Sequence, residues 1–480
     1  MNDMLDLLES AARSAAGHLD GLGNEPVWRA TPAALRAELA EQGLPETGLD
    51  QAELLERIER QVLAYPMGNG HPAFFGWVNA APHPAGIAGA VLAAAVNPSS
   101  AGGDHADVYL ERAVVRWIAE LVGFPHEPGA GLLTSGASMA TIVAVGAARQ
   151  RALARAGWDV RERGLIGAPQ LTAYASAEVH SCVGKAIELL GIGRANLRVV
   201  ADDGAGHLDP AALRAAIAAD RTAGMLPFLA VGSAGTVTTG AVDPLREIAG
   251  ACAESGLWFH VDGAYGAFGV LDPVIADRYA GIELADSVAL DPHKWLQVPA
   301  GVGCLLVRDR GQLRESFSLV PPYLRDESGD PLGWYSEYGI EQTRPFRALP
   351  VWAALAARGR GGVAADITAC TSAARLLDEL VAKDPDFEVA AETEVSIVAF
   401  RFSPAGIEEA EADRITHGLA SAIQARGKAF ITDSRFRDRP VLRACLINPA
   451  VGEPELRLLL NEARAAAAML AGQRGGTERG

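Results

Sequence analysis

The chain has 480 residues, of which 49% are hydrophobic and 21% charged, and its formal net charge at pH 7 is −17. This length and composition indicate a compact protein of roughly two to three domains and exclude a disordered chain. The negative charge repels polyanions, so we expect a small-molecule partner and no nucleic acid.

The cysteines and the apolar segments indicate where the protein works. Its five cysteines are widely spaced, odd in number and without a C-x-x-C pair, so we expect reduced thiols and neither a disulfide framework nor a metal site. The N-terminus lacks the pattern of a secretory signal, and the apolar stretch 85–96 is shorter than the roughly 20 residues of a membrane span. We therefore expect a cytoplasmic protein that does not enter membranes.

Residues 1–75 are expected to form an N-terminal helical arm, because leucines recur there at helical spacing between glycine and proline breaks. In residues 76–350, apolar runs such as 228–231 and 257–261 alternate with Ala-rich stretches. This alternation predicts a large α/β domain with a mostly parallel sheet covered on both faces. Asp209 and Asp243 each precede a proline and are expected to cap helices.

The pattern of apolar and polar residues changes after Arg347. Residues 351–472 are expected to form a small α+β domain, with short strands near 387–389, 396–400 and 441–446. The Gly-rich, charged residues 473–480 are expected to form a frayed tail.

The segment Asp291-Pro292-His293-Lys294-Trp295 follows an apolar strand and carries the strongest chemical signal. A lysine in a low-dielectric pocket has a lowered pKa, and its free amine is a nucleophile for carbonyl carbons. An ordinary exposed lysine after a turn would give the same local sequence. Asp262 ends the strand 257–261, where an acid can keep a pyridinium nitrogen protonated or merely cap a turn.

Two predicted helix starts complete the set of candidate site segments. Gly136-Ala137-Ser138 opens an Ala-rich helix whose free amides suit a phosphate, although such turns are often only caps. His180 begins another helix, where its ring could stack on a planar cofactor or simply lie at the surface.

Taken in this order, the segments resemble the group II decarboxylases that use pyridoxal 5′-phosphate (PLP), which include aromatic-L-amino-acid and glutamate decarboxylases. Further matching segments are 71–77, 102–111 and 344–352. The resemblance implies the fold-type I, aspartate-aminotransferase-like architecture, PLP as cofactor, and a homodimer. The arm would wrap the partner, and the active site would lie at the subunit interface.

The resemblance also assigns roles by position. Lys294 becomes the Schiff-base lysine, Asp262 the partner of the pyridine nitrogen, and His180 the ring that stacks on the cofactor. The other cofactor-binding positions are Ala137, Ser138, Thr236, Ala264 and His293.

The sequence departs from the family pattern at three residues. Asp291 stands where several members have an asparagine that holds the phosphate, and a carboxylate there would repel the phosphate unless it points away or is paired. Asp291 is therefore left out of the expected phosphate site. Pro345 and Pro350 interrupt the family's usual run before the small domain and stiffen that connection.

The implied reaction is decarboxylation of an L-amino acid to an amine and CO₂. The stretch 321–343 has the composition of a segment that closes over a site and supplies a proton. Tyr335 is the first candidate for the proton donor, or alternatively an interface residue, with Tyr338 second and Tyr323 third. The ring-rich residues 74–77 favour an aromatic substrate.

Three alternatives to this reaction keep the same cofactor. Oxidative deamination to an aldehyde and amino transfer would both use Lys294 and Asp262. A PLP-binding regulator without catalysis is disfavoured, because the short acidic arm contains no basic DNA-binding module.

Overall fold

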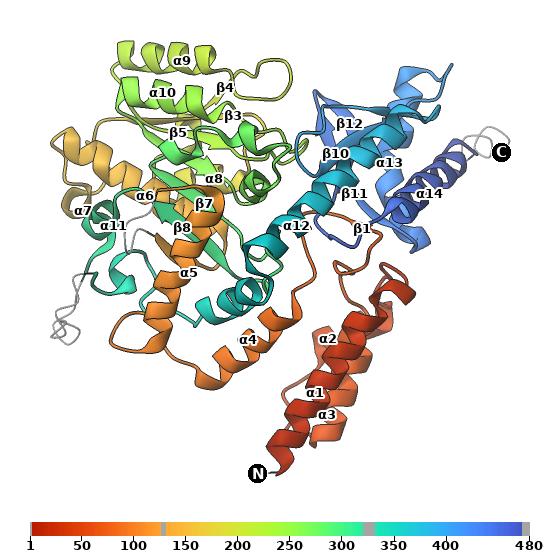
Figure 1. Cartoon of the computed structure of the whole chain (residues 1–480). Helices are drawn as coiled ribbons and strands as arrows, with labels where there is room; N and C mark the ends of the chain where they lie inside the picture. The colour runs from red at the N-terminus through yellow and green to blue at the C-terminus, as the bar shows by residue number, and fades with distance from the viewer. Residues whose placement is uncertain (1, 126–130, 320–331, 473–480) are drawn as a thin grey trace. The chain divides into compact units, whose positions relative to one another are not determined.

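The structure is a computed structural model that describes residues 2–125, 131–319 and 332–472 (Figure 1). The chain divides into two compact units. The large unit comprises Val78–Arg375 and Ala391–Val398, and the small unit comprises Met1–Trp77, Leu376–Ala390 and Ala399–Gly480. The residues expected to form the arm therefore belong to the same unit as the C-terminal sheet.

Seven strands form the sheet of the large unit, in the order β2-β8-β7-β6-β5-β3-β4. Their bounds are β2 Gly131–Thr134, β3 Leu171–Ser176, β4 Leu197–Val200, β5 Leu226–Ser233, β6 Trp258–Asp262, β7 Ser287–Leu290 and β8 Gly303–Val307. Among the described strands of this sheet, only β8 runs against its neighbours, β2 and β7, while the other paired strands are parallel. The prediction of a mostly parallel sheet is confirmed.

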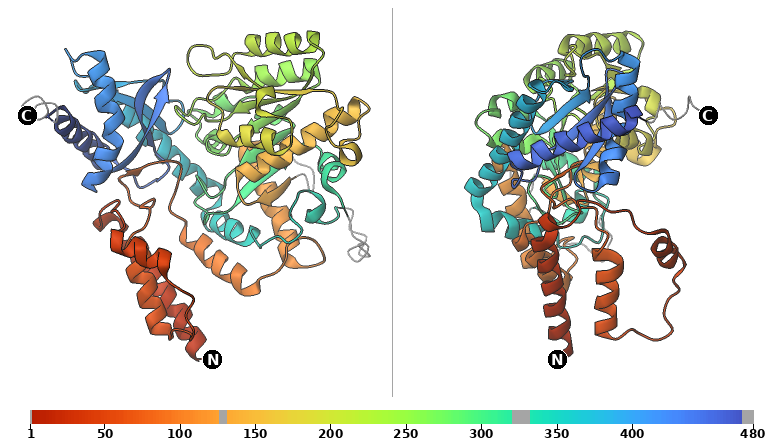
Figure 2. Two further views of the ribbon diagram at one scale, coloured as in Figure 1. Left: turned by 180° about the vertical axis from the view of Figure 1, so that it is seen from behind. Right: turned by 90° about the vertical axis from the view of Figure 1, so that its right-hand side faces the viewer.

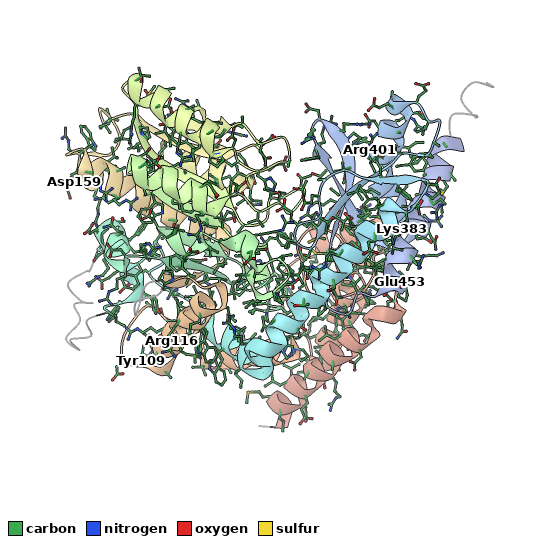
Figure 3. The ribbon with its side chains drawn as sticks, turned by 45° about the horizontal axis from the view of Figure 1, so that its top comes forward. Tyr109, Arg116, Asp159, Lys383, Arg401 and Glu453 are labelled. Carbon is green, nitrogen blue, oxygen red and sulfur yellow. The ribbon has the colours of Figure 1, made fainter. Side chains whose placement is uncertain are left out.

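Helices cover both faces of this sheet, because right-handed crossovers that move in opposite directions along a sheet lie on opposite faces. Helices α6 (Ala137–Arg155) and α8 (Ser181–Leu189) lie on one face, and α9 (Pro210–Thr222) and α10 (Leu245–Ser255) lie on the other (Figure 1, Figure 2). Helix α5 (Ala106–Val122) packs on β2 and β8 and turns Tyr109 and Arg116 outward (Figure 3).

Four further helices belong wholly or mainly to the large unit: α4 (Pro84–Val96), α7 (Val160–Arg163), α11 (Arg310–Phe317) and α12 (Ala348–Ala382). Helix α12 starts after Pro345 and takes Pro350 in its first turn, where a proline has no hydrogen bond to break. It contains a kink at Gly359, whose φ of 62° is left-handed.

One of the two predicted helix caps is confirmed, and the other is wrong. The Asp209 carboxylate caps α9, accepting a hydrogen bond of 2.8 Å from the Ala211 amide. The cap prediction for Asp243 was wrong, because α10 begins only after Pro244. The Asp243 carboxylate is fully buried and accepts hydrogen bonds from the amides of Leu208 and Ser233, so it joins the turn before α9 to the end of β5 instead.

In the small unit, five strands form a sheet in the order β1-β11-β12-β10-β9. Their bounds are β1 Phe74–Phe75, β9 Phe387–Val389, β10 Ile397–Phe402, β11 Phe430–Phe436 and β12 Arg439–Cys445. The helices of this unit are α1 Asn2–Gly21, α2 Ala33–Glu41, α3 Gln51–Ile58, α13 Glu409–Arg426 and α14 Glu453–Gly472. Among the residues that the structure describes, no helix has the length and apolarity needed to cross a bilayer.

Candidate active site

The carboxyl ends of three neighbouring parallel strands, β5, β6 and β7, bring Asp262 and Lys294 to one edge of the large sheet. Asp262, the last residue of β6, pairs with Ser233 of β5 and with Ala289 of β7. Lys294 follows β7 through a tight turn in which its amide donates to the Asp291 carbonyl at 3.0 Å. Parallel strands end at a common edge, so residues that follow β6 and β7 converge there.

The Asp262 carboxylate is 7% exposed and accepts the Ala264 amide at 3.2 Å. The Sγ of Cys182 lies 3.9 Å from its Oδ2. Side-chain atoms of His180, Cys182 and Asp262 all lie within 4.8 Å of one another. Asp262 therefore stands beside the start of α8.

Histidine 180 caps α8, and its ring is exposed. Its Nδ1 accepts a hydrogen bond of 3.2 Å from the Cys182 amide, which fixes the ring at the helix start. An exposed ring held in this way is suited to stacking on a planar group beside Asp262.

Sequence reasoning treated Cys182 only as a buried thiol, and the structure places it in the site. Burial, with the nearby Asp262 charge, raises the pKa of Cys182 to about 12, so the thiol is neutral at physiological pH. The charges of Lys294 and Asp291 also act on this pKa. The one available signal was its position two residues after His180 at a helix start.

The Lys294 side chain is 21% exposed, and its Nζ lies 3.0 Å from Asp291 Oδ2. The preceding residue, His293, is held by a contact of 2.6 Å between its Nδ1 and the Val302 carbonyl. The turn that carries Lys294 is thus tied to the start of β8.

The amino end of α6 lies against the same turn. A Cβ at Gly303 would lie 2.4 Å from the Gly136 carbonyl carbon, so only glycine allows β8 to approach α6 this closely. The Ala137 amide donates to Asp291 Oδ1 at 2.7 Å, and the Ser138 side chain is exposed. The expected phosphate residues are therefore next to Lys294, but Asp291 lies between them.

Thr236 and Ala264 follow β5 and β6 at this edge. The Ala234 amide donates to the Asp262 carbonyl at 2.8 Å, and Thr236 comes two residues later. Thr236 is 1% exposed, and its hydroxyl is bonded to that of Thr239 at 3.0 Å.

The expected acid Tyr335 lies elsewhere, in a short helix, Tyr335–Glu337, with its ring 3% exposed. It packs edge-on against Tyr338, and Arg344 lies over its ring, 4.7 Å from the centroid. Burial raises its pKa well above the ordinary value. Within the described ranges its hydroxyl has no hydrogen-bond partner, and no contact links it to Lys294.

Of the other two candidate tyrosines, the structure describes Tyr338. The Tyr338 hydroxyl donates to the Leu332 carbonyl, and burial raises its pKa. Tyr323 lies outside the described residues. The structure therefore does not bring Tyr335 or Tyr338 to the site where it brings Lys294 and Asp262.

The residues at this edge fit PLP. Lys294 offers an amine for the aldehyde, Asp262 a carboxylate for the pyridine nitrogen, and His180 a ring face. The glycine-lined start of α6 offers amides for the phosphate, and the two backbones that approach there leave no room for a Cβ at Gly303. Each part of the cofactor therefore has a matching group from this chain.

Known proteins with related sequences and structures support this assignment. The chain matches the pyridoxal-dependent decarboxylase conserved domain over residues 32–403. It is 30% identical over 455 residues to an aromatic-L-amino-acid decarboxylase of Bacillus atrophaeus, covering 94% of this chain and 92% of that protein. It is 29% identical over 429 residues to a phenylacetaldehyde synthase of Arabidopsis thaliana, covering 86% of each.

A solved structure of Oryza sativa TDC with PLP and tryptamine superimposes with a TM-score of 0.91 at 26% identity, and 98% of each chain is covered. The fold-type I architecture and PLP as cofactor, both expected from the sequence, are confirmed. The chain therefore belongs to the pyridoxal-dependent decarboxylase family and is a PLP-dependent carboxy-lyase.

Proposed function

We propose that the protein decarboxylates an L-amino acid, preferably an aromatic one, to the corresponding amine and CO₂. The observation that carries this proposal is the convergence of Lys294 and Asp262 at one sheet edge, with the exposed His180 ring beside Asp262. This set joins an amine nucleophile, a fixed negative charge and a flat ring, which together suit carbanion chemistry on PLP.

Bound PLP supplies an electron sink for the bond that breaks at the substrate's α carbon. Lys294 would hold the cofactor covalently, and the Asp262 carboxylate would keep the proton on its pyridine nitrogen. His180 would lie against the ring face. The remaining contacts to the cofactor would come from Ala137, Ser138, Thr236, Ala264 and His293.

The acid that returns a proton to the α carbon is proposed to be Tyr323 rather than Tyr335. Burial raises the pKa of both Tyr335 and Tyr338, which makes them weaker acids. Their rings belong to the hydrophobic core around α6. Tyr323, the remaining tyrosine that the sequence singled out, lies outside the described residues.

The aromatic preference is supported by a relative rather than by the ring-rich residues 74–77. The bacterial relative is an aromatic-L-amino-acid decarboxylase. Among the ring-rich residues 74–77, Phe74 and Phe75 are buried in the small unit, and the ring of Trp77, which is 47% exposed, packs against Phe430 of the same unit with 5.1 Å between the ring centroids.

Carbon dioxide release from a panel of aromatic, acidic and aliphatic L-amino acids tests the proposal, with amine, aldehyde and oxygen measured in the same samples. We expect the highest kcat/KM for an aromatic amino acid, with one amine formed per CO₂. A higher kcat/KM for an acidic amino acid would overturn the aromatic preference. Stoichiometric oxygen uptake with aldehyde would support the alternative reaction, as in the phenylacetaldehyde synthase relative.

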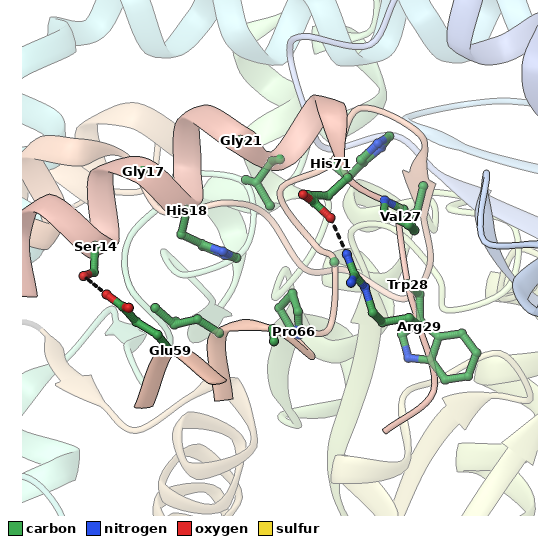
Figure 4. A pocket seen from close by; sticks show the side chains of 16 residues that line it. Ser14, Gly17, His18, Gly21, Val27, Trp28, Arg29, Glu59, Pro66 and His71 are labelled. Carbon is green, nitrogen blue, oxygen red and sulfur yellow. Dashed lines mark hydrogen bonds and ion pairs between the residues drawn. The ribbon is translucent and has the colours of Figure 1, made fainter. Parts of the chain in front are cut away.

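A homodimer is the proposed assembly. Apolar side chains of the arm face solvent in the single chain, at 39–57% exposure: Leu5, Leu8, Leu54, Ile58 and Val62. The Ser14 hydroxyl donates a hydrogen bond to the Glu59 carboxylate, which joins α1 to the segment after α3. A cavity of about 390 Å³ within the arm region lies beside this bond (Figure 4). Exposed apolar surface of this kind typically marks a protein interface, so a second copy is the proposed occupant.

The proposed location is the cytoplasm. All five cysteines are described, and each is buried and free of a disulfide. Thiols that remain reduced are typical of a reducing compartment.

A further inference from the structure

Asp291 occupies a central position between the cofactor lysine and the expected phosphate site. Its side chain is 6% exposed. One carboxylate oxygen accepts the Ala137 amide at 2.7 Å, and the other lies 3.0 Å from Lys294 Nζ. The Nδ1 of His293 lies 3.6 Å from the first oxygen. The carboxylate is therefore paired, and it faces the site rather than pointing away from it.

The Ala137 amide is the first of helix α6, whose 19 residues place the positive end of the helix dipole at this point. The capping residue, Gly136, has no side chain to satisfy the first amides. These amides are the natural ligands for the dianionic phosphate of PLP. Asp291 thus bonds to a donor that the phosphate also requires.

The ion pair with Lys294 changes when PLP binds. An ammonium next to Asp291 offsets its negative charge, but a lysine nitrogen bonded to the cofactor would no longer be a free ammonium and would carry at most one proton to share with the carboxylate. The carboxylate would then face a phosphate dianion across a shared amide, and like charges at this range repel. An asparagine of the same size would carry no charge and could donate a hydrogen bond to the phosphate.

We propose that Asp291 competes with the phosphate of PLP for the amino end of α6, and so weakens cofactor binding specifically through the phosphate. The residue is therefore a determinant of cofactor affinity and not a ligand of the phosphate. This inference rests on the PLP site and does not depend on which amino acid is the substrate.

The test compares the affinity of the full-length protein for PLP and for pyridoxal, which lacks the phosphate. The cofactor is first removed by dialysis against hydroxylamine, and binding is followed by quenching of tryptophan fluorescence, since Trp295 adjoins Lys294. The variants are Asp291→Asn and Asp291→Ala. The control is Asp309→Asn, because Asp309 also accepts a helix-start amide, that of Gly311 in α11, but lies after β8.

We expect the dissociation constant for PLP to fall about tenfold in Asp291→Asn, because the negative charge is removed and asparagine can donate a hydrogen bond to the phosphate. The constant should fall less in Asp291→Ala, which removes the charge but offers no donor. The constant for pyridoxal should not fall in either variant, and Asp309→Asn should match the parent with both ligands. Measurable pyridoxal binding also confirms that each variant is folded. An unchanged or higher dissociation constant for PLP, or an equal fall for both ligands, would overturn the proposal.

Discussion

Two residues of β6 show how burial assigns different chemistry to neighbouring side chains. His260 and Asp262 lie two positions apart and so share one face of the strand. Burial lowers the pKa of His260 to about 4, so its ring is neutral at physiological pH, and its Nδ1 lies 2.8 Å from the Ser287 hydroxyl. A neutral His260 brings no cation to Asp262, which leaves that carboxylate for the pyridine nitrogen.

This arrangement predicts a specific consequence of removing the charge at position 262. Asp262→Asn keeps the size of the side chain but no longer holds the pyridine nitrogen protonated, so kcat should fall at least about a hundredfold. Circular dichroism should match the parent, and Asp209→Asn, which alters the exposed cap of α9, should retain near-parental kcat. A turnover of Asp262→Asn close to the parent's would mean that Asp262 only shapes the turn to Ala264.

The tyrosines make a second prediction at this scale. The Tyr335 hydroxyl is buried and has no partner in the described part of the chain, so Tyr335→Phe should leave the ratio of amine to aldehyde unchanged. Tyr338→Phe should do the same. Tyr323→Phe should slow amine formation while CO₂ is still released, with aldehyde, ammonia and peroxide formed as oxygen is consumed. A product shift in Tyr335→Phe and none in Tyr323→Phe would restore Tyr335 as the acid.

At the scale of elements, one histidine links the turn before α9 to the segment Ala391–Val398. The Nδ1 of His207 lies 2.8 Å from Asp203, and its Nε2 lies 2.5 Å from the buried Glu394. Glu394 also accepts the Val242 amide, in the loop that follows β5, and pairs with Arg278. The segment is thereby fixed to the loop that carries Thr236.

Hydrogen bonding to Glu394, and then to Asp203, raises the pKa of His207 from 6.5 to about 9. A pKa that is higher in the folded protein stabilises the fold below the unfolded value, and this stability is lost as the pH rises through about 9. Tm should therefore fall between pH 6.5 and 9. Besides Asp203 and Glu394, the charged groups nearby are Arg278 and Asp243. Burial raises the pKa of Asp243 to about 6, so Asp243 titrates below this pH window.

Thermal denaturation across this pH range checks the prediction. His207→Gln should lower Tm at pH 6.5 and flatten its decline toward pH 9, since glutamine does not titrate. Parallel pH profiles of parent and variant would show that His207 does not carry this dependence.

Whether the sequence could predict a site residue depended on whether its signal is local to one element or comes from a contact between distant elements. Lys294 and Asp262 could be identified because each stands directly after a buried strand, which is a local feature. Cys182 and the orientation of Asp291 depend on contacts between segments about 80 and 150 residues apart, and no local pattern encodes these contacts. The same reason explains Asp243, whose local sequence indicates a cap while its long-range partners bury it.

Strands were predicted well where they are apolar and poorly where they are polar or very short. β5 and β6 are continuous apolar runs, and periodicity located both. β11 alternates with exposed polar residues, and β1 has only two residues, so neither was anticipated. The burial of Tyr335 was not anticipated, because the composition of a segment does not reveal which of its rings enter the core.

At the scale of the whole molecule, the apolar side chains of the arm predict how the chain assembles. Leu5→Glu combined with Leu8→Glu places two charges on an apolar surface and should convert the proposed dimer to a monomer with little activity. Light scattering after gel filtration measures the mass. Ile166→Glu, at a position 94% exposed in the large unit, is the matched control and should keep the parent's mass. A monomeric parent, or a double variant that remains dimeric, would contradict the proposed assembly.

Lys294 is the residue proposed to hold PLP, and the other proposed roles in the site depend on it. The chain has only four lysines, Lys185, Lys294, Lys383 and Lys428, and the other three are exposed, as Lys383 is at the end of α12 (Figure 3). Reduction of the PLP-loaded protein with borohydride, followed by mass spectrometry of its peptides, identifies the lysine that is bonded to the cofactor. The account predicts a phosphopyridoxyl group on Lys294 alone, and an unmodified Lys294, with or without label on another lysine, would contradict it.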